Sequence, residues 1–355
     1  MRFEWEMGIT LKELAHALGL SPTTVSRALN GYPEVNEDTR WRVMEAARKL
    51  NYRPNTRAKS LATGRAQAIG HVIPVTDKHE MVNPVFADFV AGAGESYSRA
   101  GYDMVISVVA DADEAQAYRD LVGRGSVDGV IVHAPRQKDA RIPLLLDLGI
   151  PFLVHGRSSG IDAPYSWLDI NNRRGFRRAT DFLLDLGHRR IALINGLEFM
   201  DFAARRRSGY LDALAARGVQ PDHALLASAE MTETNGYRTA QRMLAMPDPP
   251  SAFLVSSILL AIGVRHAVWE AGLELGRDVS VITHDDDLSY LKNGDDVPLF
   301  TATRSSVREA GRLSAEMLLD LVANPASGPV NRLLEVELMV GRSTGPCPRI
   351  TRESA

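Results

Sequence analysis

The stretch SPTTVSRALNG, residues 21–31, is the most informative part of this sequence. Ser21 is a favourable N-cap and Pro22 then occupies the first helical position, so a helix is expected to begin here. Val25, Ala28 and Leu29 would share the buried face of that helix. The opposite face would carry small hydroxyls, one guanidinium and one amide. Such a face on so short a helix indicates a polar binding partner.

The residues before and after this stretch extend the pattern to three helices. Thr10 precedes LKELAHALG, and Glu13 follows it at the spacing of a capping box. Gly19 then ends the first helix, so a tight turn would join two short helices, which defines a helix-turn-helix. A third amphipathic helix is expected over about residues 37–50. In this motif the second helix reads base edges in the major groove of DNA. The alternative to DNA binding is a helical hairpin that packs on another partner.

The N-terminal segment is basic although the whole chain is not. Residues 10–65 contain ten Lys and Arg against five Asp and Glu, a net charge of +5, whereas the 355-residue chain has a net charge of −3. The rest of the chain therefore carries −8. A basic module on an acidic body suits binding to DNA phosphates, although an ordinary solvated helical surface could have the same composition.

Length and composition limit the other classes of protein. A chain of 355 residues suggests two or three domains. Cys347 is the single cysteine, so no internal disulfide can form, which suits a reducing cytoplasm. The N-terminal MRFEWEMG lacks the apolar stretch of a signal peptide, and no run of about 18 apolar residues indicates a membrane span. We therefore expect a cytoplasmic protein with no membrane partner.

From about residue 68 onward, short apolar runs alternate with amphipathic stretches. The runs IGHVIPV, DGVIVHA, PFLVHG and SAFLVSS are typical of buried strands, and the alternation predicts parallel sheets covered by helices. Ligands of such sheets bind beyond the carboxyl ends of the strands. The glycine pattern GAGESYSRAG lies within a helical stretch rather than after a strand, and no P-loop or nucleophile elbow is present. We therefore expect no enzymatic activity and no cofactor.

Residues 10–55, TLKELAHALGLSPTTVSRALNGYPEVNEDTRWRVMEAARKLNYRPN, closely resemble the DNA-binding domain of the LacI/GalR family of bacterial repressors. The core S-x-x-T-V-S-R-x-L-N and the ending N-Y-x-P-N carry this resemblance. The segments LDINNRRG, DLGHRRIALI, DVSVITHDDD and GRSTGP extend it along the chain. The segments HGR, MTETNGYR and HDDDLSYL are similar to a subgroup of repressors that control alpha-glucoside uptake operons.

The resemblance implies a fold class. It consists of an N-terminal all-α helix-turn-helix domain and an α/β body of two doubly wound parallel-sheet lobes, with the type I periplasmic-binding-protein architecture. The expected segments are a helix-turn-helix domain (1–53), a hinge helix and linker (54–67), an effector-binding and dimerisation body (68–345) and a tail (346–355). The first lobe would take about residues 68–160 and 299–325, and the second about 168–298 and 330–345.

The resemblance also implies which residues contact operator DNA. Bases would be read by Pro22, Thr23 and Arg27, because an arginine can bind guanine O6 and N7. Phosphates would be held by Thr10, Ser21, Thr24, Ser26, Asn30 and Tyr52. In this family the segment after the third helix folds into a hinge helix on operator DNA. Leu61 would wedge into the central base step, with Asn55, Ala58 and Lys59 in the minor groove; the alternative is that Leu61 packs on the body.

The effector is expected in a cleft between the lobes. The candidate contacts, taken from strand ends and from the resemblance, are His79, Asn83, Phe86, His133, His155, Arg157, Arg206, Met231, Ser257 and Asp285. Arg206 matches the family arginine that clamps the effector, and Asp285 matches a carboxylate that accepts hydroxyl bonds. Met231 replaces a residue that is often aromatic, and Ser257 lies where Asn or Asp is common. These two changes favour a ligand larger than a monosaccharide.

Some of these residues have simpler interpretations. His133 and His155 could be structural histidines at strand ends. The HDDD segment, residues 284–287, is not expected to bind a metal ion, because three adjacent carboxylates rarely converge on one ion.

Together these patterns predict a homodimeric repressor on a pseudo-palindromic operator, released when a mono- or disaccharide binds the cleft. The alternative is a corepressor-dependent regulator that responds to a non-sugar metabolite such as a nucleobase. A transport solute-binding protein would lack residues 10–65.

Overall fold

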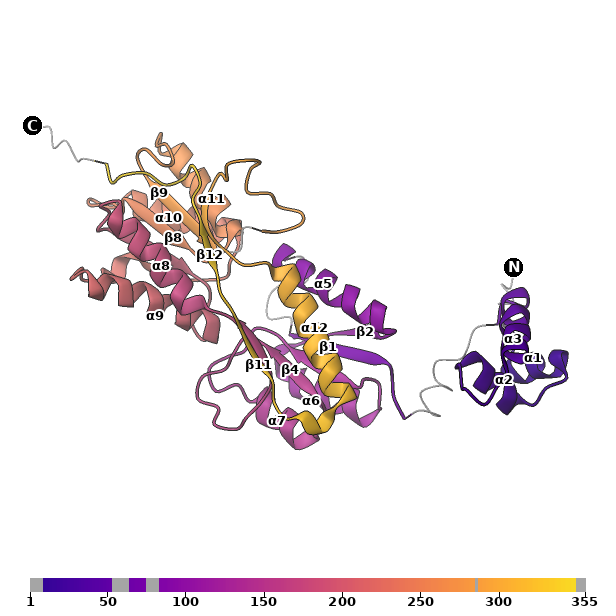
Figure 1. The fold of residues 1–355 in the computed structure, drawn as a ribbon. Helices are drawn as coiled ribbons and strands as arrows, with labels where there is room; N and C mark the ends of the chain where they lie inside the picture. Colours follow the sequence, from indigo (N-terminus) through magenta and orange to yellow (C-terminus); the bar gives the residue numbers. More distant parts are fainter. Residues whose placement is uncertain (1–8, 53–63, 75–82, 285–286, 349–355) are drawn as a thin grey trace, which may run out of the picture. The chain divides into compact units, whose positions relative to one another are not determined.

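The computed structural model describes residues 9–52, 64–74, 83–284 and 287–348, and the chain divides into two compact units, residues 1–66 and 67–355. Figure 1 shows the first unit as a group of short helices and the second as two α/β lobes. Within the described residues, no helix combines the length and apolar character needed to cross a membrane.

The N-terminal unit contains the three predicted helices, α1 (Leu11–Leu18), α2 (Pro22–Leu29) and α3 (Glu37–Lys49). The capping box of α1 is formed, because the Thr10 backbone N–H donates to the Glu13 carboxylate at 2.7 Å and the Glu13 N–H donates to the Thr10 hydroxyl at 3.3 Å. Gly19 ends α1 with a φ of 65°, which a glycine adopts without strain. Leu14, Val25 and Val43, one from each helix, form the centre of a small apolar core.

The first lobe is a six-stranded parallel sheet in the order β11-β5-β4-β3-β1-β2. Its strands are β1 (Ala68–Pro74), β2 (Asp103–Val109), β3 (Gly129–Val132), β4 (Phe152–His155), β5 (Trp167–Ile170) and β11 (Asn331–Leu334). Its helices are α5 (Pro84–Ala100), α6 (Glu114–Gly123), α7 (Arg141–Leu148) and α12 (Val307–Ala323). In Figure 1, α5 and α12 lie side by side against this sheet.

The second lobe is a six-stranded sheet in the order β12-β10-β9-β8-β6-β7, in which only β12 is antiparallel. Its strands are β6 (Ile191–Asn195), β7 (Leu226–Ser228), β8 (Ala252–Val255), β9 (Ser280–His284), β10 (Thr301–Arg304) and β12 (Glu337–Met339). Its helices are α8 (Asn172–Asp185), α9 (Asp201–Ala216), α10 (Glu233–Leu244) and α11 (Ile258–Glu270). Helix α8 packs on α9, and α10 packs on α11.

The chain changes lobes at positions that differ from the predicted ones. Strands β5 and β11 pair with each other in the first sheet, although the sequence placed them in the second lobe. Strand β10 pairs with β9 in the second sheet, although it was placed in the first lobe. Helix α12 returns to the first lobe as predicted. The errors arise because the sequence of a four-residue strand does not specify which sheet the strand extends, whereas its hydrogen-bonding partner does.

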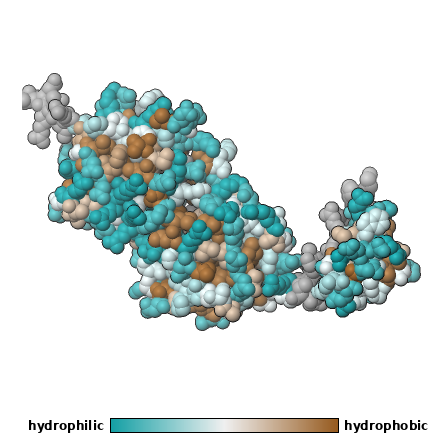
Figure 2. Space-filling model, viewed as in Figure 1, coloured by the Kyte–Doolittle hydropathy of each residue, from teal (hydrophilic) through white to brown (hydrophobic). Residues whose placement is uncertain are grey.

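Apolar side chains are concentrated between the sheets and their helices. Ile69, Ile131 and Leu153 in the first lobe are fully buried, as are Leu193 and Leu254 in the second. The face in Figure 2 is mostly hydrophilic, with hydrophobic patches visible in both lobes. Both lobes are therefore well packed. Figure 1 shows the C-terminal segment passing from β11 in the first lobe to β12 in the second.

The contact between α5 and α12 gives a first prediction. A Cβ atom at Gly92 would overlap the backbone carbonyl of Arg308, whereas a Cβ at Gly94, also in α5, would meet only the Met104 methyl at 3.8 Å. We expect Gly92→Ala to lower the free energy of unfolding by about 1–3 kcal/mol through overpacking. Gly94→Ala should leave it unchanged or raise it, because alanine favours helix. Urea denaturation of the two variants checks this, and equal stabilities would contradict the packing described.

Candidate functional site

Helix α2 presents the polar face that the sequence predicted for DNA reading. The Ser21 hydroxyl accepts the Thr24 N–H at 3.0 Å and lies 2.8 Å from the Thr24 hydroxyl, so the N-cap is formed. Val25 and Ala28 are buried against the other helices. The side chains left exposed at the start of the helix and one turn later are those of Ser21, Pro22, Thr23 and Arg27. The apolar face thus anchors a helix whose opposite face is available to a partner.

The remaining predicted phosphate contacts lie around this helix. The Asn30 amide donates to the Ser26 carbonyl at 2.9 Å and so closes the C-terminal end of α2. Tyr52 is half-buried against the apolar core, and this burial raises the pKa of its phenol. The Arg40 guanidinium donates to the carbonyl of Tyr32 at 2.9 Å and braces the loop between α2 and α3. The predicted hinge residues Asn55, Ala58, Lys59 and Leu61 lie outside the described residues.

The body contains a cavity of about 410 Å³ lined by both lobes. Its first-lobe wall comes from the carboxyl ends of β1 and β3 and the start of α5. Its second-lobe wall comes from the segments that follow β6 and β7. The lining is mostly apolar and aromatic, with Phe86, Phe199 and Phe202, and the ionisable side chains along it include Arg136 and Glu230. This combination, in the volume range of roughly 300–1,000 Å³, is typical of small-molecule sites.

The cavity contains part of the predicted effector set. Asn83, Phe86, His133 and Met231 line it. Asn83 is also the N-cap of α5 and accepts the Val85 N–H at 3.0 Å. His79 and Asp285 lie outside the described residues, and the remaining predictions, His155, Arg157, Arg206 and Ser257, are not among the lining residues.

The two predicted arginines have partners within the protein. Arg157 donates to the Asp169 carboxylate at 2.7 Å, and its guanidinium lies 4.8 Å from the centre of the Trp167 ring. Arg206 is buried and donates to the Asn172 side chain at 2.7 Å and to the Ser256 carbonyl at 2.8 Å.

The guanidinium of Arg206 also lies 4.8 Å from the centre of the Phe202 ring, which lines the cavity. Arg206 is therefore in contact with the wall through an aromatic side chain. Its role as an effector clamp stays a prediction.

His155 and Ser257 have structural contacts in this conformation. The His155 ring stacks on Phe89 with ring centres 4.2 Å apart. Ser257 is the N-cap of α11 and accepts the Leu260 N–H at 3.3 Å. These contacts agree with the structural interpretation of His155 without testing a role in ligand binding.

Arg141, which the sequence did not single out, shapes the first-lobe wall. It forms buried ion pairs with Glu114 and Asp139, both at 2.6 Å. The same guanidinium donates to the carbonyls of His133 at 3.0 Å and Ala134 at 3.3 Å. Ala134 has a φ of 42°, an unusual value for alanine, so these bonds hold the chain where it leaves β3. Burial raises the pKa of Asp139, but the hydrogen bonds and the charge of Arg141 together lower it by more. The pKa of Asp139 is therefore below its ordinary value.

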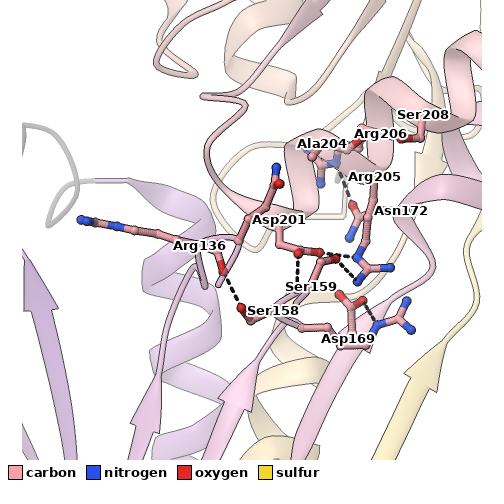
Figure 3. Close-up of polar contacts among 12 residues, drawn as sticks. Arg136, Ser158, Ser159, Asp169, Asn172, Asp201, Ala204, Arg205, Arg206 and Ser208 are labelled. Carbon is pink, nitrogen blue, oxygen red and sulfur yellow. Dashed lines mark hydrogen bonds and ion pairs between the residues drawn. The ribbon is translucent and has the colours of Figure 1, made fainter. Parts of the chain in front are cut away.

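A buried carboxylate connects the two lobes next to the cavity (Figure 3). Asp201, the first residue of α9, is 1% exposed and accepts the Ser159 N–H at 2.5 Å. It also forms an ion pair with Arg205, whose guanidinium donates to the Ser159 hydroxyl at 3.0 Å. The Asp201 N–H donates to the Pro135 carbonyl at 3.0 Å, and Gln137 donates to the Phe199 carbonyl at 3.2 Å. We call these bonds the Asp201 contact.

Sequence reasoning missed Arg136, Phe199, Phe202 and Glu230 as cavity residues. All four lie in segments that follow β3, β6 or β7. The segments LEFMDF and SAEMT follow strands β6 and β7, so the strand-end rule that selected His133 also points to Phe199, Phe202 and Glu230. Arg136 lies three residues beyond His133 in the segment after β3.

The comparisons with known proteins agree with both units. Residues 10–55 match the model of bacterial regulatory proteins of the lacI family, and residues 180–344 match that of the periplasmic binding protein-like domain. The HTH-type transcriptional regulator AglR of Rhizobium meliloti (strain 1021) is 46% identical over 348 residues, which are 96% of each protein. RafR of Escherichia coli is 35% identical, over 90% of this chain and 94% of that protein. The chain belongs to the LacI family of bacterial transcriptional regulators.

Solved structures confirm the predicted fold class. The lac repressor dimer bound to operator and the anti-inducer ONPF has a TM-score of 0.81 at 27% identity, over 95% of this chain and 99% of that one. The complex of the transcriptional regulator CelR with cellobiose has a TM-score of 0.70 at 29% identity, over 94% of this chain and 99% of that one. The chain is thus a DNA-binding transcriptional regulator with a helix-turn-helix domain and a periplasmic-binding-protein-like body.

The Asp201 contact gives a second prediction. Asp201→Asn keeps the shape of the side chain but removes the charge that binds Arg205 and the Ser159 N–H. We expect a loss of about 1.5–3 kcal/mol in the free energy of unfolding, because hydrogen bonds to a buried charge are among the strongest. The control is Asp212→Asn, also in α9, which removes an exposed ion pair with Arg173 of α8 and should cost less than about 1 kcal/mol. Similar losses in urea denaturation would contradict the importance of the contact.

The buried histidines give a third prediction. Burial, and next the charge of nearby His155, lower the pKa of His71 to about 3. Burial likewise places the pKa of His133 well below its ordinary value. In the unfolded chain these two imidazoles take up protons near pH 6.5, whereas in the folded chain they stay neutral. Their contribution to the free energy of unfolding is therefore complete above pH 6.5 and is lost as the pH drops towards 3.

The measurement is the free energy of unfolding from pH 7 to pH 5. We expect His71→Asn to reduce the mean slope over this range by about 1 kcal/mol per pH unit, which approaches the full-proton value of about 1.4 near pH 5, and the exposed His223→Asn serves as the control. A slope that is unchanged in His71→Asn would contradict the burial of a neutral imidazole.

Proposed function

We propose that this regulator is a homodimeric repressor that a sugar releases from its operator by binding in the interlobe cavity. The observation that carries the proposal is the cavity itself, which both lobes line and which lies beside the Asp201 contact. A ligand that touches both walls changes the preferred arrangement of the lobes, and such differential binding is what couples two sites. The solved lac repressor dimer, bound to operator and an anti-inducer, supports the same arrangement here.

The proposed effector is a disaccharide, with alpha-glucosides as the first candidates. A volume of about 410 Å³ accommodates more than one sugar ring, and the aromatic faces of Phe86, Phe199 and Phe202 can cover the apolar faces of such rings. Glu230 and Arg136 supply an acceptor and a donor for hydroxyl groups. The CelR–cellobiose complex supports a disaccharide, and the resemblance of three segments to alpha-glucoside repressors supports the linkage.

The proposed DNA contacts divide into two groups. Pro22, Thr23 and Arg27 on the exposed face of α2 would read bases, and the neighbouring hydroxyls and amide would position phosphates. The hinge contacts of Asn55, Ala58, Lys59 and Leu61 rest on the family resemblance. We place the protein in the cytoplasm, where bacterial DNA lies. Its proposed role is regulatory and not enzymatic.

Arg27 gives a fourth prediction. Arg27→Ala should weaken operator binding by about 1–3 kcal/mol and relax the preference for guanine at one position of each half-site. Arg42→Ala, which removes an exposed guanidinium from α3, is the control and should leave base preference unchanged. Binding to a set of single-base operator variants measures the effect. An equal loss on random DNA would show that Arg27 contacts only phosphates.

The proposed function is tested by fluorescence anisotropy with DNA from the region upstream of the protein's own gene. The full chain is bound to this DNA and titrated with glucose, maltose, sucrose, trehalose and cellobiose. Release by a disaccharide at concentrations where glucose has no effect supports the proposal. Tightened binding would instead indicate corepression. Tight DNA binding that no sugar alters would exclude these sugars and direct the test to nucleobases.

A further inference from the structure

A line of buried hydrogen bonds leads from the interior of the first lobe to the cavity wall. The Tyr97 hydroxyl, on α5, lies 3.2 Å from Nε2 of His71, on β1. Nδ1 of His71 lies 3.0 Å from Nε2 of His133, which follows β3 and lines the cavity. Tyr97 is 1% exposed, His71 0% and His133 9%. Two imidazoles and a phenol thus form a chain that starts in the core and ends at the cavity.

The positions of the protons in this chain follow from the buried phenol. Burial keeps both imidazoles neutral, since it lowers the pKa of His71 and of His133, and a neutral imidazole has one donor and one acceptor nitrogen. Among the described residues, Nε2 of His71 is the hydrogen-bond partner of the Tyr97 hydroxyl. A buried hydroxyl proton without an acceptor costs about 1–3 kcal/mol, so Tyr97 donates to His71.

The remaining protons are then determined. Nε2 of His71 accepts, so Nδ1 of His71 carries the proton and donates to Nε2 of His133. Nε2 of His133 therefore accepts, and its proton must be on Nδ1. The opposite order would leave the Tyr97 proton without an acceptor.

The ring of His133 is also held in orientation. Phe86 and Phe89 both meet it edge to face, with ring centres 5.2 Å and 5.1 Å away. The carbonyl of the same residue is bound by Arg141 at 3.0 Å. The backbone, the ring plane and the tautomer of His133 are therefore each fixed by a different neighbour.

We propose that Tyr97 and His71 are positioning residues that hold His133 as the Nδ1–H tautomer, so that the first-lobe wall offers the effector a hydrogen-bond donor. This inference about the effector rests on the proposed function, although the tautomer does not. A donor at this wall binds an oxygen of the effector that accepts a hydrogen bond, including a ring or glycosidic oxygen, which cannot donate. Across the cavity Glu230 supplies an acceptor, so the two walls offer a sugar opposite hydrogen-bonding roles.

The tautomer is tested by nuclear magnetic resonance on the full chain labelled with ¹⁵N-histidine. Long-range ¹H–¹⁵N correlation spectra distinguish protonated from unprotonated ring nitrogens, and loss of signals in His133→Gln assigns those of His133. We expect a protonated Nδ1 and an unprotonated Nε2 at His133. We also expect Tyr97→Phe to yield a mixture of tautomers, because the phenol proton no longer sets the order. An Nε2–H form in the unmodified chain, or an unchanged tautomer in Tyr97→Phe, would overturn the proposal.

The effect on the ligand is tested by operator release with maltose, sucrose, trehalose and cellobiose. Tyr97→Phe should bind operator normally without sugar and need about 3- to 10-fold more sugar for release, because only the fraction of its molecules in the Nδ1–H form can donate to the sugar. The matched control is Tyr210→Phe, which removes another buried phenol that donates to the Ile191 carbonyl at 2.8 Å. Equal shifts in both variants would reduce the role of Tyr97 to general stability and overturn the proposal. If no sugar releases the operator, the proposed function fails while the spectra still decide the tautomer.

Discussion

The hydrogen bonds of Asp201 between the two lobes are the interaction on which the arrangement of the lobes most depends. The Asp201 carboxylate is almost fully buried at the start of α9, where the helix N-terminus favours a negative charge. This second-lobe carboxylate accepts the Ser159 N–H, and the backbone N–H of Asp201 donates to the Pro135 carbonyl. Both partners lie in segments that follow strands of the first lobe. A change in the angle between the lobes must alter these bonds, so the cavity and the lobe arrangement share one set of contacts.

The two walls of the cavity are built differently. On the first-lobe side, Arg141 binds the carbonyl of His133 and two carboxylates. The hydrogen bonds from Tyr97 through His71 hold the His133 ring on the side away from the cavity. On the second-lobe side, the wall consists of segments after β6 and β7, and Phe199 remains half exposed. Both walls combine polar groups with aromatic side chains, so a ligand can be positioned by its polar atoms while its apolar faces are covered.

The sequence predicted what depends on local signals and failed where distant pairing decides. The capping box at Thr10 and the N-cap at Ser21 are local, and both are formed. The sheet to which β5, β10 and β11 belong depends on which strand each one pairs with, and those lobe bounds were wrong. Arg157 was predicted from its place after β4, but its ion-pair partner Asp169 lies in the neighbouring parallel strand β5, a pairing that the local sequence does not specify.

In the proposed function, sugar and operator compete through one conformational equilibrium. The most direct test measures the affinity of the full chain for the releasing disaccharide by calorimetry, with and without saturating operator DNA. Linkage requires that operator weaken sugar binding by the same factor by which sugar weakens operator binding. We expect equal factors, typically about 5- to 150-fold. A sugar affinity that operator leaves unchanged would contradict it.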